Sequence, residues 1–260
     1  MGVSVTGAAD GGEERFVGFG NDDLPVGTFS EHDEQYADFS EADVATIQAV
    51  WRFTVTSPER VYALIRAVEY VVAGELSGDI VECGVWRGGS MMAVARTLAT
   101  LGHDDRILWM YDTFAGMTRP GPHDVAFDGV PAELEFNRRR ISDESSTWAA
   151  ASLSDVRSNM VGTGYPEACM RFVRGPVERT IPAVAPDRIA LLRLDTDWYS
   201  STLHELQWLY PRLITGGVLI IDDYGHWDGA RQATEEYLSR LERRPLLNRI
   251  DYSGRLLVKP

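Results

Sequence analysis

The amino-acid sequence predicts an α/β fold built on a doubly wound, mostly parallel sheet. Three observations support this expectation. Apolar stretches of strand length alternate with amphipathic stretches of helix length over most of the chain, a glycine-rich turn follows the first of these strands, and acidic residues follow two later strands. Strands that alternate with helices are typical of parallel sheets whose crossover helices cover both faces. The length of 260 residues suits one such domain with an added segment.

Residues 1–57 are expected to form an N-terminal tail and lid segment ahead of a main domain at residues 58–260. The tail is rich in Gly, Asp and Glu and lacks a steady hydrophobic period, whereas residues 41–53 carry apolar residues at helical spacing. The pair Ser57-Pro58 predicts the start of the next helix, because serine is a good N-cap and proline suits the first helical position.

Strands and helices alternate along the main domain. Seven strands are expected, at residues 79–85, 106–111, 170–174, 188–195, 217–222, 247–252 and 255–259. Helices are expected at residues 58–75, 88–101, 147–160, 176–180, 200–213 and 229–242, and a long loop at residues 112–140. Because Ser253-Gly254 between the last two strands is a hairpin signal, the sheet is expected to end in an antiparallel C-terminal hairpin.

The charge balance argues against nucleic acid as a partner. The chain has 25 basic and 39 acidic residues and a net charge of −14, whereas phosphate binding favours a basic surface. No apolar run reaches the length of about 18 residues that predicts a membrane-spanning helix, and the N-terminus lacks the features of a secretory signal. We therefore expect a cytoplasmic protein with no membrane partner, in which Cys83 and Cys169 are free thiols.

Acidic residues follow two of the apolar strands directly. Asp195 ends one strand, and Asp222 and Asp223 end the next one. Because the carboxyl ends of neighbouring parallel strands meet at one crevice, these carboxylates are expected to form an all-oxygen cluster that suits Mg²⁺. The alternative is an acidic pair that caps the following helix. Asp197 is placed to point into the same crevice, or else to lie at the N-terminus of the next helix, where the dipole favours a carboxylate.

The first expected strand runs into a glycine-rich turn that reads Val81-Glu82-Cys83-Gly84-Val85-Trp86-Arg87-Gly88-Gly89-Ser90. Glycine permits a tight turn and close approach of a ligand, and the start of a helix offers free N–H groups. Asp112, at the end of the next strand, has the usual position of a ribose-binding carboxylate. These features predict a nucleotide-type ligand, although the turn lacks the GxGxxG pattern of dinucleotide enzymes. A tight turn without a ligand is the alternative.

Four segments, taken together, resemble the macrocin O-methyltransferase family. They read Val81-Glu-Cys-Gly-Val-Trp-Arg-Gly-Gly-Ser90, Tyr111-Asp-Thr-Phe-Ala-Gly116, Leu192-Arg-Leu-Asp-Thr-Asp-Trp-Tyr199 and Gly216-Gly-Val-Leu-Ile-Ile-Asp-Asp-Tyr224. The resemblance covers residues 50–245 and implies the seven-stranded sheet of class I methyltransferases. It also implies an enzyme that uses S-adenosylmethionine and Mg²⁺ to methylate sugar hydroxyls of macrolide and related antibiotics.

The resemblance implies a role for individual residues of this chain. Asp195, Asp222 and Asp223 are the expected Mg²⁺ ligands, and Asp197 is the expected general base. Asp112 is expected to bind the ribose hydroxyls of the cofactor, and the other residues expected near the cofactor are Glu82, Cys83, Gly84, Val85, Trp86, Arg87, Ser90 and Phe114. The expected partners are a small-molecule glycoside and further copies of the chain, as a homodimer or higher homo-oligomer.

His226 follows the acidic pair closely, and it is expected either to line the acceptor pocket and share in proton transfer or to be a surface loop histidine. Three other functions stay open. They are a catechol-type O-methyltransferase with the same metal site, an NAD-dependent oxidoreductase on a similar sheet, and a non-catalytic protein that binds a metal or a nucleotide. The sequence does not identify the acceptor, which the unmatched segment 1–45 and the loop 115–146 are expected to select, and segments 1–57 and 115–146 are candidate lids.

Overall fold

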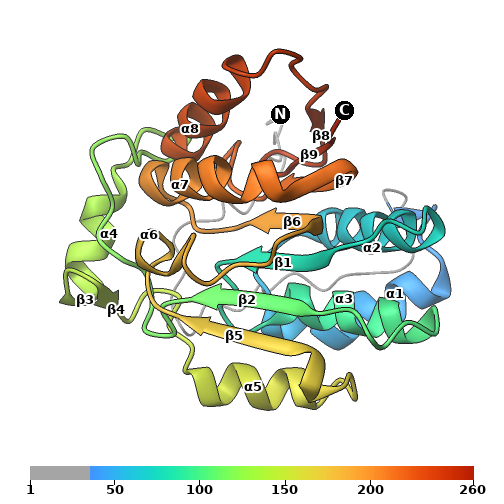
Figure 1. Ribbon diagram of the computed structural model, residues 1–260. Coiled ribbons are helices and arrows are strands. Elements are labelled where there is room, and N and C mark those ends of the chain that lie inside the picture. Colours follow the sequence, from blue (N-terminus) through green and yellow to red (C-terminus); the bar gives the residue numbers. More distant parts are fainter. Residues whose placement is uncertain (1–35) are drawn as a thin grey trace, which may run out of the picture.

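A mixed sheet forms the centre of the protein in the computed structural model, which describes residues 36–260 (Figure 1). Within this range the sheet has seven strands: β1 (Asp79–Cys83), β2 (Leu108–Asp112), β5 (Met170–Arg174), β6 (Ile189–Leu194), β7 (Leu213–Ile221), β8 (Asn248–Arg249) and β9 (Arg255–Val258). Their order is β5-β2-β1-β6-β7-β9-β8. The first five run parallel, β9 is antiparallel to β7, and β8 is antiparallel to β9. The predicted fold class is therefore confirmed.

The order of the strands reverses between β1 and β6. From β1 the chain adds β2 and then β5 on one side, and it later returns to add β6 and β7 on the other side. Cys83 pairs with Leu194, so the carboxyl ends of β1 and β6 lie side by side. The arrowheads of β2, β5 and β6 point toward the side of the molecule where α4 lies (Figure 1). In doubly wound sheets, ligands bind in the crevice at such a switch point.

Helices cover both faces of the sheet. One face packs against α1 (Glu41–Val50), α2 (Pro58–Ala73), α3 (Gly89–Thr100) and α5 (Leu153–Val161), whose buried apolar side chains belong to one core cluster. The other face packs against α6 (Val177–Thr180), α7 (Tyr199–Leu209) and α8 (Asp228–Ser239), which contribute to a second cluster. Burial on both faces explains why the central strands are nearly continuous apolar runs.

The helices ahead of the sheet begin where the sequence predicts. Ser57 caps α2, because its side chain accepts a hydrogen bond from the N–H of Arg60. Ile47 and Val50 of α1 are fully buried in the core that α2 and α3 share. The predicted tail falls mostly in residues 1–35, which lie outside the described residues.

The expected loop at residues 112–140 is a wrong prediction. It contains α4 (Ala132–Arg139) and leads into a short antiparallel pair, β3 (Arg140–Ser142) and β4 (Ser145–Ser146). On α4 only Ala132 and Phe136 are buried, Leu134 is exposed, and four of the eight residues are charged. This narrow apolar stripe gives too weak a helical period to recognise in the sequence.

The helix expected at residues 147–160 begins later than predicted, at Leu153. Ala149 has a left-handed backbone (φ 47°), which ends any helical path through this segment, and Ser152 caps α5 by accepting a hydrogen bond from the N–H of Asp155. Trp148 is instead buried in an aromatic cluster described below. The other predicted elements are found within a few residues of their expected bounds.

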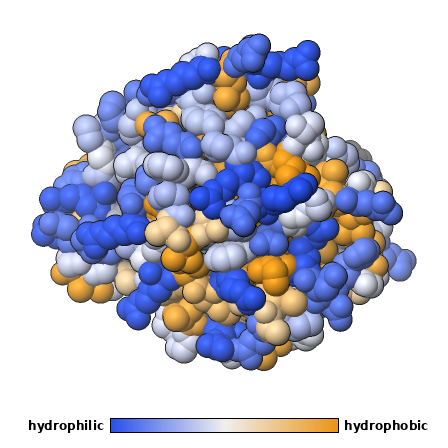
Figure 2. Space-filling model, in the orientation of Figure 1, coloured by the Kyte–Doolittle hydropathy of each residue, from blue (hydrophilic) through white to orange (hydrophobic). Residues whose placement is uncertain are grey.

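In the part of the chain that the structure describes, no helix has both the length and the apolar character needed to cross a bilayer. On the face in Figure 2, hydrophobic side chains lie in small groups between hydrophilic ones. Both cysteines are free, as expected, with Cys83 buried at the end of β1.

Candidate active site

A pocket of about 160 Å³ opens at the carboxyl ends of the parallel strands. Its lining comes from the turn after β1, the end of β2, the residues after β6 and β7, and the segment 116–149 that follows β2. The pocket therefore lies at the switch point between β1 and β6, where the fold predicts a ligand site.

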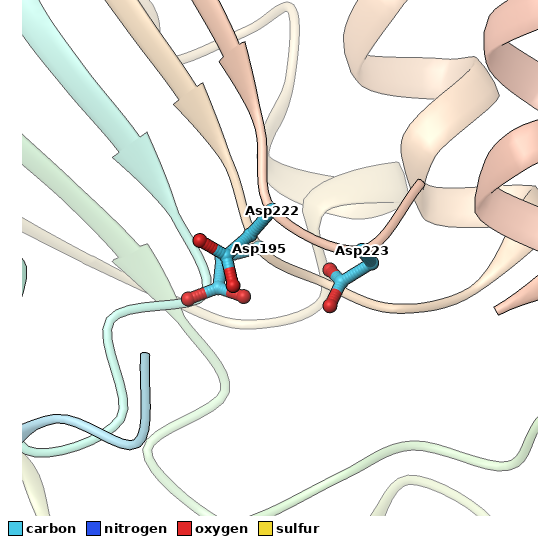
Figure 3. A group of neighbouring side chains, drawn as sticks. All are labelled: Asp195, Asp222 and Asp223. Carbon is cyan, nitrogen blue, oxygen red and sulfur yellow. The ribbon is translucent and has the colours of Figure 1, made fainter. Parts of the chain in front are cut away.

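Three carboxylates meet on one wall of the pocket. Asp195 follows β6, and Asp222 and Asp223 follow β7, which is the neighbouring strand. One oxygen from each lies within 4.8 Å of the others. Figure 3 shows the side chains of Asp195 and Asp222 next to each other, with that of Asp223 beside them. The structure thus brings together the three residues that the sequence predicts as metal ligands.

Arg193 lies directly below these carboxylates, and sequence reasoning offered no role for it. Its side chain is buried and forms ion pairs with Glu82 of β1, with Asp195 at 2.6 Å, and with Asp222. A buried guanidinium is stable when carboxylates surround it, because the fork of donors satisfies several oxygens at once. Arg193 therefore holds acidic residues of three adjacent strands in one network.

A second arginine reaches the cluster from the helical layer. Arg60 of α2 pairs with Asp222, and its Nε lies 3.0 Å from Asp251. Thr56, just ahead of α2, donates a hydrogen bond of 3.1 Å to Asp222. Burial acts to raise the pKa of Asp222, but Arg193 and Arg60 hold this pKa below its ordinary value. Asp222 is therefore ionised and fixed by partners from both sides.

The charges in this wall do not balance. Two guanidinium groups, of Arg193 and Arg60, face six carboxyl groups, which belong to Glu82, Asp195, Asp197, Asp222, Asp223 and Asp251. Burial, with the charges of Asp197 and Asp195, raises the pKa of Asp223 well above its usual value. A divalent cation would relieve this excess of negative charge, and Mg²⁺ prefers carboxylate oxygens. The donor set therefore fits Mg²⁺.

Asp197 is held in an unusual backbone conformation beside the cluster. Its φ is 67°, in the left-handed region, and its N–H donates to Asp223 at 3.1 Å. The indole Nε1 of Trp227 donates to Oδ1 of Asp197 at 2.6 Å. Burial and the charge of Asp195 raise the pKa of Asp197 to about 8. Asp197 thus lines the pocket in a fixed orientation and can hold a proton near neutral pH.

The turn after β1 is tied to the end of β2. Both oxygens of Asp112 accept hydrogen bonds, Oδ2 from the N–H groups of Val85 (2.9 Å) and Trp86 (3.0 Å), and Oδ1 from that of Phe114 (2.7 Å). Gly84 passes so close to Asp195 that a Cβ would overlap its carbonyl oxygen. The glycine turn, Asp112 and the carboxylate cluster therefore share one crevice.

The residues predicted near the cofactor divide into two groups. Gly84, Trp86 and Asp112 line the pocket. The other six do not line it. Arg87 donates to the carbonyl of Arg52, and five are buried, namely Glu82, which pairs with Arg193, and Cys83, Val85, Ser90 and Phe114. Three of the nine residues predicted near the cofactor therefore line the pocket, and the other six lie beside these three in the chain.

Sequence reasoning considered Trp198 as a pocket wall but did not predict the group of three tryptophans that forms the aromatic wall of the pocket. Trp148, Trp198 and Trp227 pack edge to face with centroid distances of 5.1–6.1 Å. Trp148 and Trp227 line the pocket with Met117. The three tryptophans are far apart in the sequence and follow different elements, so no local pattern could have shown that they meet.

His226 lines the same pocket on its outer side. Its Nδ1 lies 3.1 Å from the hydroxyl of Tyr252, and burial lowers its pKa, with a further contribution from Arg60. The imidazole is therefore neutral at physiological pH. The expectation that His226 lines the pocket agrees with this position.

The strand order and the position of the pocket define a class I methyltransferase fold. The chain belongs to the macrocin-O-methyltransferase (TylF) family, whose sequence model matches residues 30–259. The protein is therefore an O-methyltransferase, and the methyl donor of this class is S-adenosylmethionine.

Curated relatives agree with this assignment. The 8-demethyl-8-(2,3-dimethoxy-α-L-rhamnosyl)-tetracenomycin-C 4'-O-methyltransferase of Streptomyces olivaceus is 34% identical over 89% of this chain and 84% of its own. The demethyldecarbamoylnovobiocin O-methyltransferase of Streptomyces niveus is 31% identical over 77% of this chain and 73% of its own. The mycinamicin III 3''-O-methyltransferase of Micromonospora griseorubida is 32% identical over 72% and 70%.

Solved structures share the fold. The O-methyltransferase NovP superposes with a TM-score of 0.70 at 30% identity, covering 80% of this chain and 82% of its own. The calicheamicin methyltransferase CalS11 has a TM-score of 0.58 at 16% identity, covering 96% of this chain and 99% of its own, and at this identity it supports the fold alone.

Proposed function

We propose that the protein methylates a hydroxyl of a sugar that is part of a glycosylated natural product, and that this transfer depends on Mg²⁺. The position of the carboxylate cluster beside Gly84, at the switch point of the sheet, carries the proposal. The names of the three relatives support a sugar acceptor. Two of these names give the position of the methylated hydroxyl, 4' in one enzyme and 3'' in the other.

The donor would bind along the turn after β1. Gly84 allows the chain to approach a ligand closely, and Trp86 gives the pocket a flat side wall. Asp112 would accept hydrogen bonds from the ribose hydroxyls, and Phe114 lies next to it, just after the end of β2. Cys83, Val85 and Ser90 of the same turn are buried and support its conformation. The carboxylate cluster lies beside this turn, because Gly84 contacts the backbone of Asp195.

Asp195, Asp222 and Asp223 would hold the metal ion. Mg²⁺ bound there supplies Lewis acidity, which lowers the pKa of a sugar hydroxyl that is otherwise a poor nucleophile. Arg193 and Arg60 keep Asp222 in place, so this ligand is oriented before the ion arrives. Methyl transfer is an in-line displacement, so the pocket must hold the acceptor oxygen opposite the sulfur of the donor.

Asp197 is the proposed general base. Trp227 fixes one oxygen of its carboxylate, and the other oxygen is available to accept the proton of the sugar hydroxyl. His226 is the second candidate for proton transfer, and its position beside Tyr252 also suits contact with the acceptor. The tryptophans, which exclude water, favour a reaction in which the positive sulfonium and the developing alkoxide neutralise each other.

The proposal is tested by methyl transfer from S-adenosylmethionine to a rhamnosyl glycoside, measured with and without a chelator. We expect EDTA to abolish turnover and Mg²⁺ to restore it. Asp223→Asn should lower kcat by about 10²-fold or more, because a metal ligand is lost, while S-adenosylhomocysteine binds within about twofold of the wild-type Kd. Asp223 is a better target than Asp222, which also partners two buried arginines.

The exposed Asp187→Asn is the matched control and should behave as the wild type. Full activity in EDTA would contradict the metal dependence.

The aromatic wall also suits a flat acceptor, so catechol is the competing substrate, and faster methylation of catechol than of the glycoside would favour that alternative. Calorimetric titration with NAD checks the oxidoreductase alternative, and size-exclusion chromatography with light scattering checks the expected homodimer.

A further inference from the structure

A strained turn between β6 and α7 carries Asp197. The N–H of Trp198 donates to the carbonyl of Thr196 at 2.8 Å, which closes a three-residue γ-turn with Asp197 at its centre. The φ of 67° at Asp197 makes this the γ-turn of positive φ, which is rare and strained. A strained backbone persists only where neighbouring groups hold it, and such strain gathers at functional sites. The groups that hold this turn therefore bear on the reaction.

Helix α7 holds the turn through Thr196. The carbonyl of Thr196 accepts a further hydrogen bond of 3.3 Å from the hydroxyl of Ser201, in the first turn of α7. The hydroxyl of Thr196 donates to Oε1 of Glu205, in the second turn of α7, at 2.9 Å. Ser201 thus fixes the backbone of Thr196 and Glu205 fixes its side chain, so the residue that precedes Asp197 is tied to the helix twice.

Glu205 lies in surroundings that suit an apolar side chain. It is fully buried, and Leu206 and Leu209 of the same helix belong to the apolar cluster on this face of the sheet. Its Oε2 is buried and has no hydrogen-bond partner in the part of the chain that the structure describes, although the weakly polar thiol of Cys83 lies near the carboxyl group. Burial of a carboxyl group that is only partly hydrogen-bonded costs free energy. A residue kept at such a cost to the fold is typical of a functional role.

We propose that Glu205 is a positioning residue for methyl transfer, because its hydrogen bond from Thr196 keeps the γ-turn closed and Asp197 directed into the pocket. This inference rests on the proposed function, in which Asp197 is the general base, and it adds a residue that does not itself line the pocket. A base must meet the acceptor hydroxyl in a defined orientation, and a misplacement of about 1 Å can slow a reaction by about 10²-fold. The bond between Thr196 and Glu205 therefore affects turnover rather than the binding of substrates.

Glu205→Met tests the proposal, because methionine keeps the length of the side chain and removes the acceptor. The hydroxyl of Thr196 lines the pocket and can then bond to water. We expect kcat for a rhamnosyl glycoside to fall by about 10- to 100-fold, while KM for the donor and the Kd of S-adenosylhomocysteine stay within about twofold of wild type. The urea midpoint at pH 7 should be no lower than that of wild type, whereas a merely structural role predicts a lower midpoint with kcat retained.

Three further variants identify the hydrogen bond as the cause. Glu205→Gln keeps an acceptor oxygen for Thr196 and should restore kcat. Thr196→Val removes the donor and should match Glu205→Met, and the double variant should be no slower than either single one, because both act through one bond. Thr97→Val is the matched control, since this buried threonine of α3 donates to the carbonyl of Ala93 and does not line the pocket, so its loss should leave kcat unchanged.

A spectroscopic measurement reports on Asp197 without any turnover. The indole N–H of Trp227 donates to Oδ1 of Asp197, so its proton resonance depends on where this carboxylate lies. The chain has seven tryptophans, and the variant Trp227→Phe identifies the indole peak of Trp227 in a nitrogen–proton correlation spectrum. We expect this peak to move upfield in Glu205→Met, because the bond to Asp197 weakens, and to keep its position in Glu205→Gln.

The outcomes separate the role of Glu205 from the proposed function. An unmoved Trp227 peak in Glu205→Met would overturn the proposal, because Asp197 would then keep its place without Glu205. A wild-type kcat in Glu205→Met, or equal losses of kcat in Glu205→Met and Glu205→Gln, would overturn it as well. If the wild type transferred no methyl group to the glycoside, the proposed function would fail, and the Trp227 peak would still decide whether Glu205 holds the turn.

Discussion

Single residues in this protein show how a crowded acidic site tolerates its own charge. Asp222 has two arginine partners and is ionised, whereas Asp197 and Asp223 lack them and have raised pKa values. Glu82 and Asp195 also pair with Arg193, yet burial raises their pKa values to about 8 and about 6. Asp222 keeps its charge because Arg193 and Arg60 both pair with it. Arginines therefore neutralise Asp222, whereas a bound cation would neutralise Asp223, which has no arginine partner in the described part of the chain.

Glu205 of α7 is a different case. It is fully buried beneath the turn at Asp195, and its Oε1 accepts a hydrogen bond of 2.9 Å from Thr196. No arginine or lysine pairs with it among residues 36–260. Burial raises the pKa of Glu205 well above its ordinary value, although the bond from Thr196 acts to lower it. The side chain is therefore a neutral acid in the folded protein.

This gives a stability prediction with a definite sign. The unfolded chain releases the proton of Glu205 above about pH 4.5, while the folded chain keeps it, so wild-type stability falls as pH rises above that value. Glu205→Gln has no proton to lose. The free energy of unfolding of this variant should therefore rise relative to wild type between pH 5 and 8, by up to about 1.4 kcal/mol per pH unit.

Urea denaturation at several pH values measures this difference. Glu242→Gln, at an exposed position, is the control and should show no such trend. A difference between Glu205→Gln and wild type that stays constant with pH would mean that Glu205 is ionised in the folded protein.

At the scale of elements, the turn between β1 and α3 determines how closely the proposed donor site approaches the proposed metal site. Gly84 has a φ of 81°, and the amide N–H of Asp195 donates to the carbonyl of Cys83 at 2.9 Å. Neighbouring strands form such bonds with any residue, but a Cβ at position 84 would overlap the carbonyl oxygen of Asp195, so this approach requires glycine. Any substituent at Gly84 must move the strand that carries Asp195.

Gly84→Ala is expected to destabilise the fold and to weaken metal binding together. Gly102 gives a matched control, because its φ of 76° is similar but a Cβ there meets nothing within 4 Å. Gly102→Ala should cost about 1–2 kcal/mol for backbone strain alone, and Gly84→Ala roughly 4 kcal/mol or more. Urea denaturation gives both values, and Mn²⁺ binding by electron paramagnetic resonance gives the second readout. Equal costs in the two variants would show that the contact with Asp195 does not matter.

Some elements of the fold could be predicted from the sequence, and others could not. The parallel strands could be predicted because burial on both faces makes them long apolar runs, and Asp195, Asp222 and Asp223 could be placed because strand ends meet at one edge. Helix α4 could not be predicted, because only two of its residues, Ala132 and Phe136, are buried. The partners of Arg193 depend on which strands are neighbours, and that order is a property of the folded sheet.

At the scale of the whole molecule, the described part of the N-terminal segment belongs to the main body. Ile47 and Val50 are fully buried in the core of α2 and α3, and Thr56 reaches Asp222. Gly89, at the start of α3, lies against the backbone of Phe53 so closely that a Cβ would clash. A separate domain would make few such contacts with its neighbour. The lid role of residues up to 57 stays a prediction.

Residues 36–260 should therefore unfold as one cooperative unit. Ile47→Ala is expected to lower the free energy of unfolding by about 2–5 kcal/mol, because it opens a cavity in the shared core. Near-UV and far-UV circular dichroism should show one coincident transition, shifted to lower temperature. Ile141→Ala is the control, because Ile141 is 69% exposed and its truncation should change stability by about 0.5 kcal/mol or less. If Ile47→Ala instead produced an early, separate transition and left the main one in place, the N-terminal helix would be an independent unit, free to move as a lid over the pocket.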